Sequence, residues 1–248
     1  MQLFRLKLFA PSVGDAPSFL GWGLRCALVL SGLFFAGVLG PSLPGLGVSS
    51  GANAWAENAA SAIRSAGVPA TLPPKQVYTT SDFLRCTREP ALFEAMRQLS
   101  GTSGERSLQR MVRRPSRILF KDLREMGKAV AAFDALSWLG FDGQHAVFVH
   151  VRHRGAPPEA LAALIAHEAL HDDAQNSLRE EVALWAVEAT VWHEMKQRNP
   201  QLSAIAPGKF PLVDRLNQLE SALLQGRLEA LVRSNGGYQG LPEQSPGF

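Results

Sequence analysis

The chain has 248 residues, with 25 Lys and Arg, 22 Asp and Glu, and two cysteines. Without residues 1–56, which have the features of an export signal, 22 basic and 21 acidic residues remain and the net charge is +1. This balance gives no general affinity for nucleic acid, and a single remaining cysteine, Cys86, excludes an internal disulfide. The remaining chain of about 190 residues is long enough for one domain with a sizeable hydrophobic core.

The N-terminal segment has the composition of an export signal. An apolar run over residues 26–40 is short for a membrane span but suits the hydrophobic region of a signal peptide. Residues 54–56, Ala-Trp-Ala, then offer the small residues of a cleavage site. Three basic residues precede the apolar run: Arg5, Lys7 and Arg25. We therefore predict that residues 1–56 are a signal peptide or, if uncleaved, a membrane anchor, and that the protein is exported to the periplasm or the extracellular space.

Residues 57–116 are predicted to form a mainly helical lead. Residues 57–80 contain Pro73-Pro74 and predict a loose connection, whereas residues 81–112 are expected to be helical. Five arginines cluster over residues 106–117, but they lack the interleaved aromatic residues that would favour nucleic-acid binding. The cluster is therefore interpreted as a solvated helix face.

Three stretches after this lead predict strands. Residues 117–123 and residues 145–151 are rich in β-branched and aromatic side chains. The dipeptide Asp142-Gly143, just before the second stretch, is typical of a tight turn. Residues 128–136 fit either a strand or a short helix, because their alanines and apolar residues follow neither periodicity clearly.

The next helix carries the most informative motif of the chain. The pair Pro157-Pro158 suits a first helical turn, and residues 160–166 form an apolar, strongly helix-forming run that predicts a buried helix. His167 and His171 follow four residues apart, so one helix face presents both imidazoles to a single metal ion. Glu168 directly follows the first histidine, where it is placed to polarise a water molecule rather than to bind the metal.

A second helix is predicted to supply the third ligand. Residues 172–176 indicate a turn, after which Ser177 and Glu180 have the spacing of a capping box, and the helix is expected to end before Asn199-Pro200. After so short a turn, this helix must fold back against the first one. Either Glu180 or Glu181 then lies opposite the two histidines.

The choice between these two glutamates depends on the helix face that each occupies. Glu180 shares a face with an apolar stripe that is expected to pack on the first helix: Leu184, Val187 and Val191. Glu181 lies with Trp185 instead. We therefore favour Glu180 as the third ligand and keep Glu181 as the alternative, while Glu180 could also act only as a helix cap. Glu188 lies too far along the helix to bind the metal and is expected at most to orient a histidine.

The segment His167-Glu168-Ala169-Leu170-His171 and the glutamate helix resemble the HExxH zinc metallopeptidases of the zincin type, particularly the gluzincin-like branch. In that branch the third ligand is a glutamate that often stands in a Glu-x-x-Ala setting, which Glu180-Glu181-Val182-Ala183 matches. The resemblance covers roughly residues 117–198. The metzincin extension is absent, and the spacing from His171 to Glu180 is shorter than in thermolysin-like members, so no named family is assigned.

The resemblance implies an α+β fold in which a small β-sheet packs on the HExxH helix, with a following ligand helix and mostly helical structure elsewhere. It implies a Zn²⁺ ion held by His167, His171 and Glu180, with Glu168 as the general base in hydrolysis of a peptide or protein substrate. An extended substrate would pair with an edge strand, for which residues 145–151 are the candidate. Such enzymes often use a further side chain to stabilise the oxyanion, and the candidates are Tyr238, His193 and His150.

The C-terminal region, residues 199–248, is predicted to contain one amphipathic helix over residues 211–234 and a tail without fixed structure from Gly236 onward. His150 and His153 stand among arginines and are interpreted as a solvated strand end. No metal role is assigned to either of them.

Two functional classes fit this sequence. The first is an exported zinc metallopeptidase, and the second is a non-catalytic envelope binding protein that retains a zincin fold. Glu168 favours the enzyme, because a purely structural zinc site needs no base and is usually closed by four protein ligands. The sequence leaves the substrate, the cleavage preference and the oligomeric state open.

Overall fold

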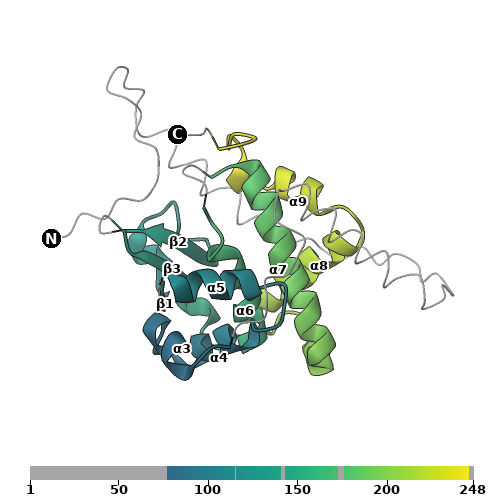
Figure 1. Cartoon of the computed structure of the whole chain (residues 1–248). Coiled ribbons are helices and arrows are strands. Elements are labelled where there is room, and N and C mark those ends of the chain that lie inside the picture. Colours follow the sequence, from purple (N-terminus) through teal and green to yellow (C-terminus); the bar gives the residue numbers. More distant parts are fainter. Residues whose placement is uncertain (1–76, 115, 141–142, 173–175, 246–248) are drawn as a thin grey trace, which may run out of the picture.

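The computed structural model describes residues 77–114, 116–140, 143–172 and 176–245, which form a small β-sheet and a set of helices (Figure 1). The predicted signal peptide or anchor, residues 1–56, lies outside the described residues, and so does Asp142 of the predicted turn. Within the described part of the chain, no helix is both long and apolar enough to cross a membrane.

The sheet has three strands in the order β1-β3-β2. The central strand β3 (His145–His150) pairs in parallel with β1 (Arg117–Lys121) and in antiparallel fashion with β2 (Ala135–Leu139). Residues 145–151, the candidate edge strand, therefore lie in the middle of the sheet. A central strand has no free backbone edge for an added peptide, so only β1 and β2 could accept one among the described strands.

The segment predicted as a strand or a short helix, residues 128–136, is instead a series of turns until β2 begins at Ala135. The amide of Val130 donates to the carbonyl of Gly127 at 3.2 Å, and the amide of Phe133 donates to that of Val130 at 3.0 Å. Gly127 has φ of 129°, a backbone conformation that favours glycine. These consecutive turns leave only the last two residues of the predicted segment in the strand.

Three short helices replace the single helical region expected over residues 81–112. They are α3 (Thr80–Cys86), α4 (Pro90–Gln98) and α5 (Glu105–Arg113). Pro90 begins α4, since its missing N–H costs nothing in a first turn. Gly101, with φ of 71°, turns the chain between α4 and α5.

Helix α6 (Pro158–Glu168) lies at the centre of the fold. It contacts α4, α5, α7 and α8 as well as strands β2 and β3, and its residues from Ala160 onward are buried, as the apolar sequence predicts. In Figure 1, α6 lies behind α5 and beside the long helix α7. The motif at the end of α6 is therefore set into the core and does not lie on an open surface.

The helix ends at Glu168, so the predicted single helix does not extend to His171. Side chains of α5 take the last carbonyl groups. The hydroxyl of Ser107 donates to the carbonyl of Ala166 at 2.7 Å, and the guanidinium of Arg110 donates to those of residues 170 and 171 at 3.2 and 3.0 Å. Arg110 thus fixes the segment that follows α6, and part of the arginine cluster is not merely a solvated helix face.

Helix α7 (Leu178–Arg198) begins and ends where the sequence predicts. The side chain of Ser177 accepts the amide of Glu180 at 3.2 Å, and Asn199 closes the helix. Two further amide groups of the first turn, at residues 178 and 179, donate to the carbonyl groups of residues 242 and 243 at 2.9 and 3.1 Å. The C-terminal segment therefore helps to cap α7.

The predicted single helix over residues 211–234 is two helices, α8 (Pro211–Leu224) and α9 (Leu228–Ser234). The break lies at Gly226, whose φ of 65° ends the first helix. The described residues of the predicted tail, 236–245, do not form a free tail, because η4 (Gly236–Tyr238) and the segment after it contact α7. Three other short 3-10 helices complete the described elements: η1 (Leu123–Met126), η2 (Val151–His153) and η3 (Pro200–Ala204).

Candidate metal centre

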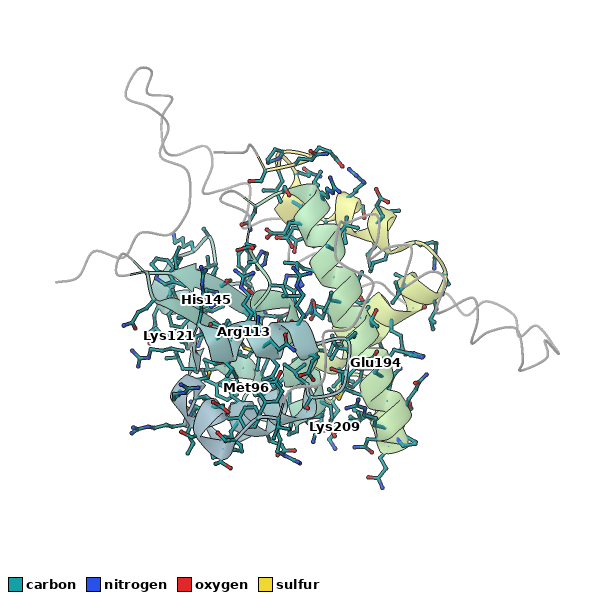
Figure 2. All side chains as sticks on the ribbon, in the orientation of Figure 1. Met96, Arg113, Lys121, His145, Glu194 and Lys209 are labelled. Atoms are coloured by element: carbon teal, nitrogen blue, oxygen red, sulfur yellow. The ribbon has the colours of Figure 1, made fainter. Side chains whose placement is uncertain are left out.

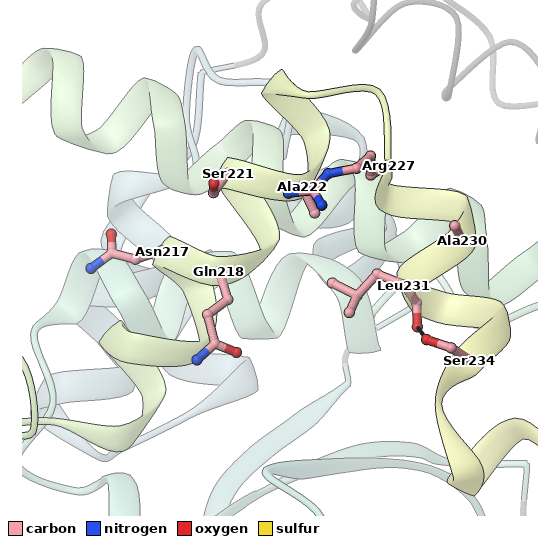
Figure 3. Close-up of a pocket in the computed structure, with 8 residues that line it drawn as sticks. All are labelled: Asn217, Gln218, Ser221, Ala222, Arg227, Ala230, Leu231 and Ser234. Carbon is pink, nitrogen blue, oxygen red and sulfur yellow. Dashed lines mark hydrogen bonds between the residues drawn. The ribbon is translucent and has the colours of Figure 1, made fainter. Parts of the chain in front are cut away.

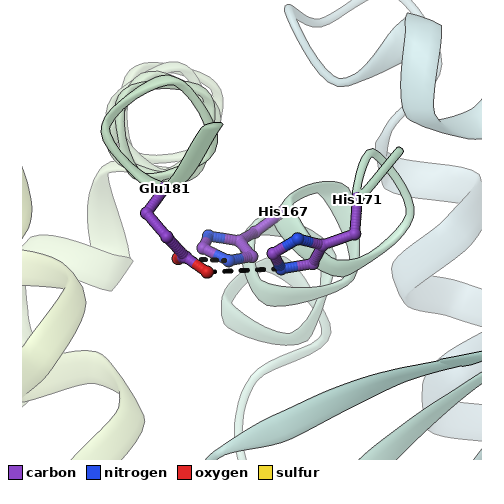
Figure 4. Close-up of side chains that lie close together, drawn as sticks. All are labelled: His167, His171 and Glu181. Carbon is purple, nitrogen blue, oxygen red and sulfur yellow. Dashed lines mark ion pairs between the residues drawn. The ribbon is translucent and has the colours of Figure 1, made fainter. Parts of the chain in front are cut away.

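Two histidines and a glutamate converge between the end of α6 and the start of α7 (Figure 4). One side-chain ligand atom from each of His167, His171 and Glu181 lies within 4.8 Å of the other two. The Nε2 atom of His167 is 3.8 Å from Oε2 of Glu181, and the Nε2 atom of His171 is 4.0 Å from Oε1. The three side chains thus surround one small volume, on the scale of a metal site.

The two imidazoles stay adjacent although the regular helix ends between them. The amide of Leu170 donates to the carbonyl of His167 at 3.0 Å, which continues the chain as one tighter turn. The rings of His167 and His171 have centroids 5.1 Å apart and an interplanar angle of 65°. The spacing of four residues therefore brings both rings to one side, as the motif predicts.

Each histidine has a second carboxylate on its other ring nitrogen. The Nδ1 atom of His167 lies 3.2 Å from Oε2 of Glu188, and the Nδ1 atom of His171 forms a hydrogen bond of 3.2 Å with Oε2 of Glu180. Only the His171 contact has hydrogen-bond geometry, and the Nδ1 atom of His167 has no hydrogen-bond partner among the described residues. A carboxylate beside Nδ1 orients the ring so that Nε2 is the nitrogen available to a metal ion. Both Nε2 atoms are the ones nearest to Glu181.

Glu180, the favoured third ligand, is not part of the converging group. Its Oε1 atom accepts the amide of Asp172 at 2.6 Å and its Oε2 atom contacts His171, so it holds the segment after α6 in place. Glu181, the alternative, is rotated by about 100° around the helix and faces both histidines. The spacing of seven residues between Glu181 and Glu188 places both on one helix face, and that pattern was the available signal for the correct face.

Glu181 is a buried carboxylate whose hydrogen bonding is incomplete. Its side chain is 3% exposed, and its Oε2 atom has no hydrogen-bond partner among the described residues. Burying such an oxygen without a partner is costly, and a bound cation would remove that cost. Two imidazoles and one carboxylate are a donor set that Zn²⁺ prefers in catalytic sites. The residues present therefore fit a zinc ion.

Burial and neighbouring charges shift the pKa values of two motif residues. Burial raises the pKa of Glu168, and the charges of Glu181 and Glu188 add to this effect. Burial lowers the pKa of His171, but the hydrogen bond to Glu180 and the nearby carboxylates outweigh it and raise the pKa to about 9. A carboxyl group with a raised pKa suits a step in which it first accepts and then returns a proton.

Tyr238 lies beside this group although it comes from the far end of the chain. The indole Nε1 of Trp185 donates to its hydroxyl at 2.9 Å, and the two rings pack edge to face with centroids 5.7 Å apart. Burial raises the pKa of Tyr238, and the carboxylates of Glu181 and Glu168 raise it further. The hydroxyl therefore keeps its proton at neutral pH and remains a hydrogen-bond donor.

The other two oxyanion candidates have different surroundings. His193 pairs with Glu220 through a 2.7 Å contact, farther along α7. His150 is buried at the end of β3, where its Nδ1 atom accepts the amide of Arg152 at 3.2 Å. His153 is also buried, so the interpretation of this pair as a solvated strand end is wrong.

Sequence reasoning missed Arg215 and Asp134, which form a series of contacts that begins at Glu188. Arg215 of α8 donates to Oε2 of Glu188 at 3.3 Å, and its Nε atom lies 2.7 Å from Oδ2 of Asp134. Asp134 also lies 2.6 Å from the Nε2 atom of His153. Arg215 is the cation next to an apolar stripe of α8, and nothing in its own segment indicates a partner so distant in sequence.

A separate hollow of about 750 Å³ lies on α8 and α9, away from the histidines (Figure 3). Its lining is mostly neutral and includes Asn217, Gln218, Arg227 and Leu231. The hollow contains none of the converging ligands, so it gives no support to a reaction there.

Comparisons of the chain with protein-family models, with curated proteins and with solved structures found no match.

Proposed function

We propose that the protein is an exported zinc-dependent peptidase, with His167, His171 and Glu181 as metal ligands and Glu168 as the general base. The observation that carries this proposal is the convergence of three ligand atoms within 4.8 Å around a buried carboxylate oxygen that lacks a partner among the described residues. Glu168 adjoins the first ligand in sequence and is also buried, so a base stands next to the metal position.

The donor set supports a catalytic rather than a structural ion. Among the described residues the group contains three ligands, whereas structural zinc sites usually have four. A bound zinc ion would polarise a carbonyl group and make a water molecule more acidic. The carboxylates of Glu188 and Glu180 would hold the two imidazoles in the orientation that presents Nε2.

Glu168 would carry the proton transfers of amide hydrolysis. Water attacks the carbonyl carbon while the Glu168 carboxylate accepts a proton from it. The C–N bond then breaks, and Glu168 returns the proton to the departing amine nitrogen. Burial raises the pKa of Glu168, which makes its carboxylate a stronger base for accepting the proton from the water molecule.

Tyr238 and strand β2 would complete the site. The protonated hydroxyl of Tyr238 lies beside Glu181 and could donate a hydrogen bond to the oxyanion of the tetrahedral intermediate. Strand β2 (Ala135–Leu139) is an edge strand that contacts α6, and its backbone could pair with an extended peptide. We propose β2 in this role in place of residues 145–151.

The first experiment measures zinc content and peptide hydrolysis of the purified protein beside four variants. We expect about one zinc per chain in the wild type, loss of zinc in His167→Ala, and retained zinc with lost hydrolysis in Glu168→Gln. The matched pair Glu181→Gln and Glu180→Gln separates the two candidate ligands, because only the first should empty the site. Absence of zinc from the wild type after reconstitution would sink the proposal, and zinc without hydrolysis of a peptide library would favour a binding protein.

A further inference from the structure

Arg215 of α8 stands between two carboxylates from different parts of the fold. Its Nη1 atom donates to Oε2 of Glu188 at 3.3 Å, and its Nη2 atom donates to Oε1 of the same side chain. Its Nε atom lies 2.7 Å from Oδ2 of Asp134. The guanidinium therefore holds both oxygens of Glu188, in the two-pronged geometry that arginine forms and lysine cannot.

Glu188 connects Arg215 to the metal position. The Glu188 side chain is 1% exposed, and its Oε2 atom lies 3.2 Å from Nδ1 of His167. A buried carboxylate with one contact could rotate about its last bond. With both oxygens held by Arg215, the plane of the Glu188 carboxylate is fixed and its Oε2 atom stays 3.2 Å from Nδ1 of His167, a close contact that does not have the alignment of a hydrogen bond.

Two further contacts place Arg215 next to the other proposed components. Asp134 directly precedes Ala135, the first residue of edge strand β2. The guanidinium carbon of Arg215 also lies 5.9 Å from the ring centroid of Trp185, whose indole donates to Tyr238. One cation thus touches residues that adjoin the ligand histidine, the edge strand and the tyrosine.

We infer that Arg215 is a positioning residue, which fixes Glu188 so that His167 presents Nε2 to the metal. This inference rests on the proposed zinc site and adds a role for helix α8. A merely structural ion pair would stabilise the fold without acting on zinc through Glu188, and that difference is measurable.

The test is the zinc dissociation constant, from competition with a chelator, in a double-mutant cycle of Arg215→Met and Glu188→Gln. Each single variant should weaken zinc binding about 10- to 100-fold, the usual effect of removing a group that orients a ligand. The double variant should bind zinc no more weakly than Glu188→Gln alone, because Arg215 acts through Glu188. An equal further loss from Arg215→Met in the Glu188→Gln background would overturn the inference.

A second variant keeps the test decisive if Arg215→Met does not fold. Arg215→Lys retains the charge but not the two-pronged contact, so it should weaken zinc binding and alter the visible absorption spectrum of the cobalt(II)-substituted protein. Arg227→Met is the matched control, because Arg227 is an exposed arginine just after α8. This variant should leave both readouts unchanged. Wild-type zinc binding and spectrum in Arg215→Lys would refute the positioning role.

The two proposals fail in distinguishable ways. If the wild type binds no zinc, the proposed function and this inference fall together. If the wild type binds zinc and the Arg215 variants bind it equally well, only the inference falls. A protein that binds zinc without hydrolysing peptides, but loses affinity in the Arg215 variants as described, supports the inference and contradicts the peptidase.

Discussion

Two clusters of histidine and carboxylate side chains lie along α7, and they differ in how their carboxylates are satisfied. In the first, Glu181 faces two histidines and its buried Oε2 atom has no hydrogen-bond partner among the described residues. In the second, farther along the helix near the labelled Glu194 (Figure 2), His193 contacts Oε1 of Glu220 at 2.7 Å and Lys196 donates to Oε2.

A histidine that lies close to a glutamate is therefore not enough to indicate a metal site. Glu220 has a cation on one oxygen and an imidazole on the other, so its charge is balanced by protein groups. Among the described residues, no lysine or arginine forms an ion pair with Glu181. The buried carboxylate without a cation, rather than the residue types, distinguishes the candidate metal centre.

The largest effect should come from neutralising the two carboxylates one at a time. Glu181→Gln removes a metal ligand and should abolish stoichiometric zinc binding, whereas Glu220→Gln should leave zinc content unchanged. Metal analysis of the two purified variants measures the difference. Equal zinc content in both variants would show that the two clusters do not differ in metal binding.

The next effect concerns the base beside the first cluster. Glu168→Gln keeps the shape of the side chain but cannot accept a proton, so hydrolysis should fall about 10²- to 10⁴-fold while zinc remains bound. The kcat for a peptide substrate, measured beside metal content, tests this expectation. Glu194→Gln, on the part of α7 near the second cluster, is the control that should retain activity. Full activity in Glu168→Gln would remove Glu168 from the mechanism.

A smaller effect is expected from the tyrosine that only the first cluster possesses. Tyr238→Phe removes the hydroxyl that receives the Trp185 indole and lies beside Glu181. Loss of one oxyanion donor should lower kcat about 10²- to 10³-fold with little change in zinc affinity. Steady-state kinetics separate kcat from KM. An unchanged kcat would show that Tyr238 serves the packing of the C-terminal segment alone.

The smallest effect is a pH dependence of the metal-free protein. Burial lowers the pKa of His171, but Glu180 and the other carboxylates raise it to about 9, from an ordinary value of 6.5. A raised folded-state pKa contributes stability below pH 6.5 and loses it as the pH rises through 9. The free energy of unfolding of the wild type relative to His171→Gln, measured with urea in a chelator, should fall by on the order of 1 kcal/mol over this range. A constant difference would contradict the charged state of His171.

The local features of this fold could be predicted because they depend on neighbouring residues. The apolar run 160–166 indicated a buried helix, and α6 is buried. The Ser177 cap and the Asn199-Pro200 stop set both ends of α7. The four-residue spacing of His167 and His171 brought both rings together, because even a tighter turn keeps them on one side.

The third ligand depended on the rotation of α7 about its own axis. Prediction of Glu180 assumed that its apolar stripe packs on α6, but Val191 of that stripe packs against Gly104 before α5. A Cβ atom at Gly104 would lie 3.2 Å from a methyl carbon of Val191. In the structure, Glu181 and Glu188 face the histidines instead. A rotation of about 100° decides between adjacent residues, and the shared face of Glu181 and Glu188 was the one pattern within the helix that indicated it.

The motif, the buried helix that carries it and the boundaries of the helix that faces it could be predicted from the amino-acid sequence. The choice of the glutamate that faces the histidines, the order of the strands, and the approach of Arg215 and Tyr238 from the C-terminal region came from the tertiary structure. Caps, turns and periodicity depend on residues that are close in sequence, so they can be predicted from short segments of the chain. Pairing between residues such as Asp134 and Arg215 depends on how separate elements pack, which only the assembled fold specifies.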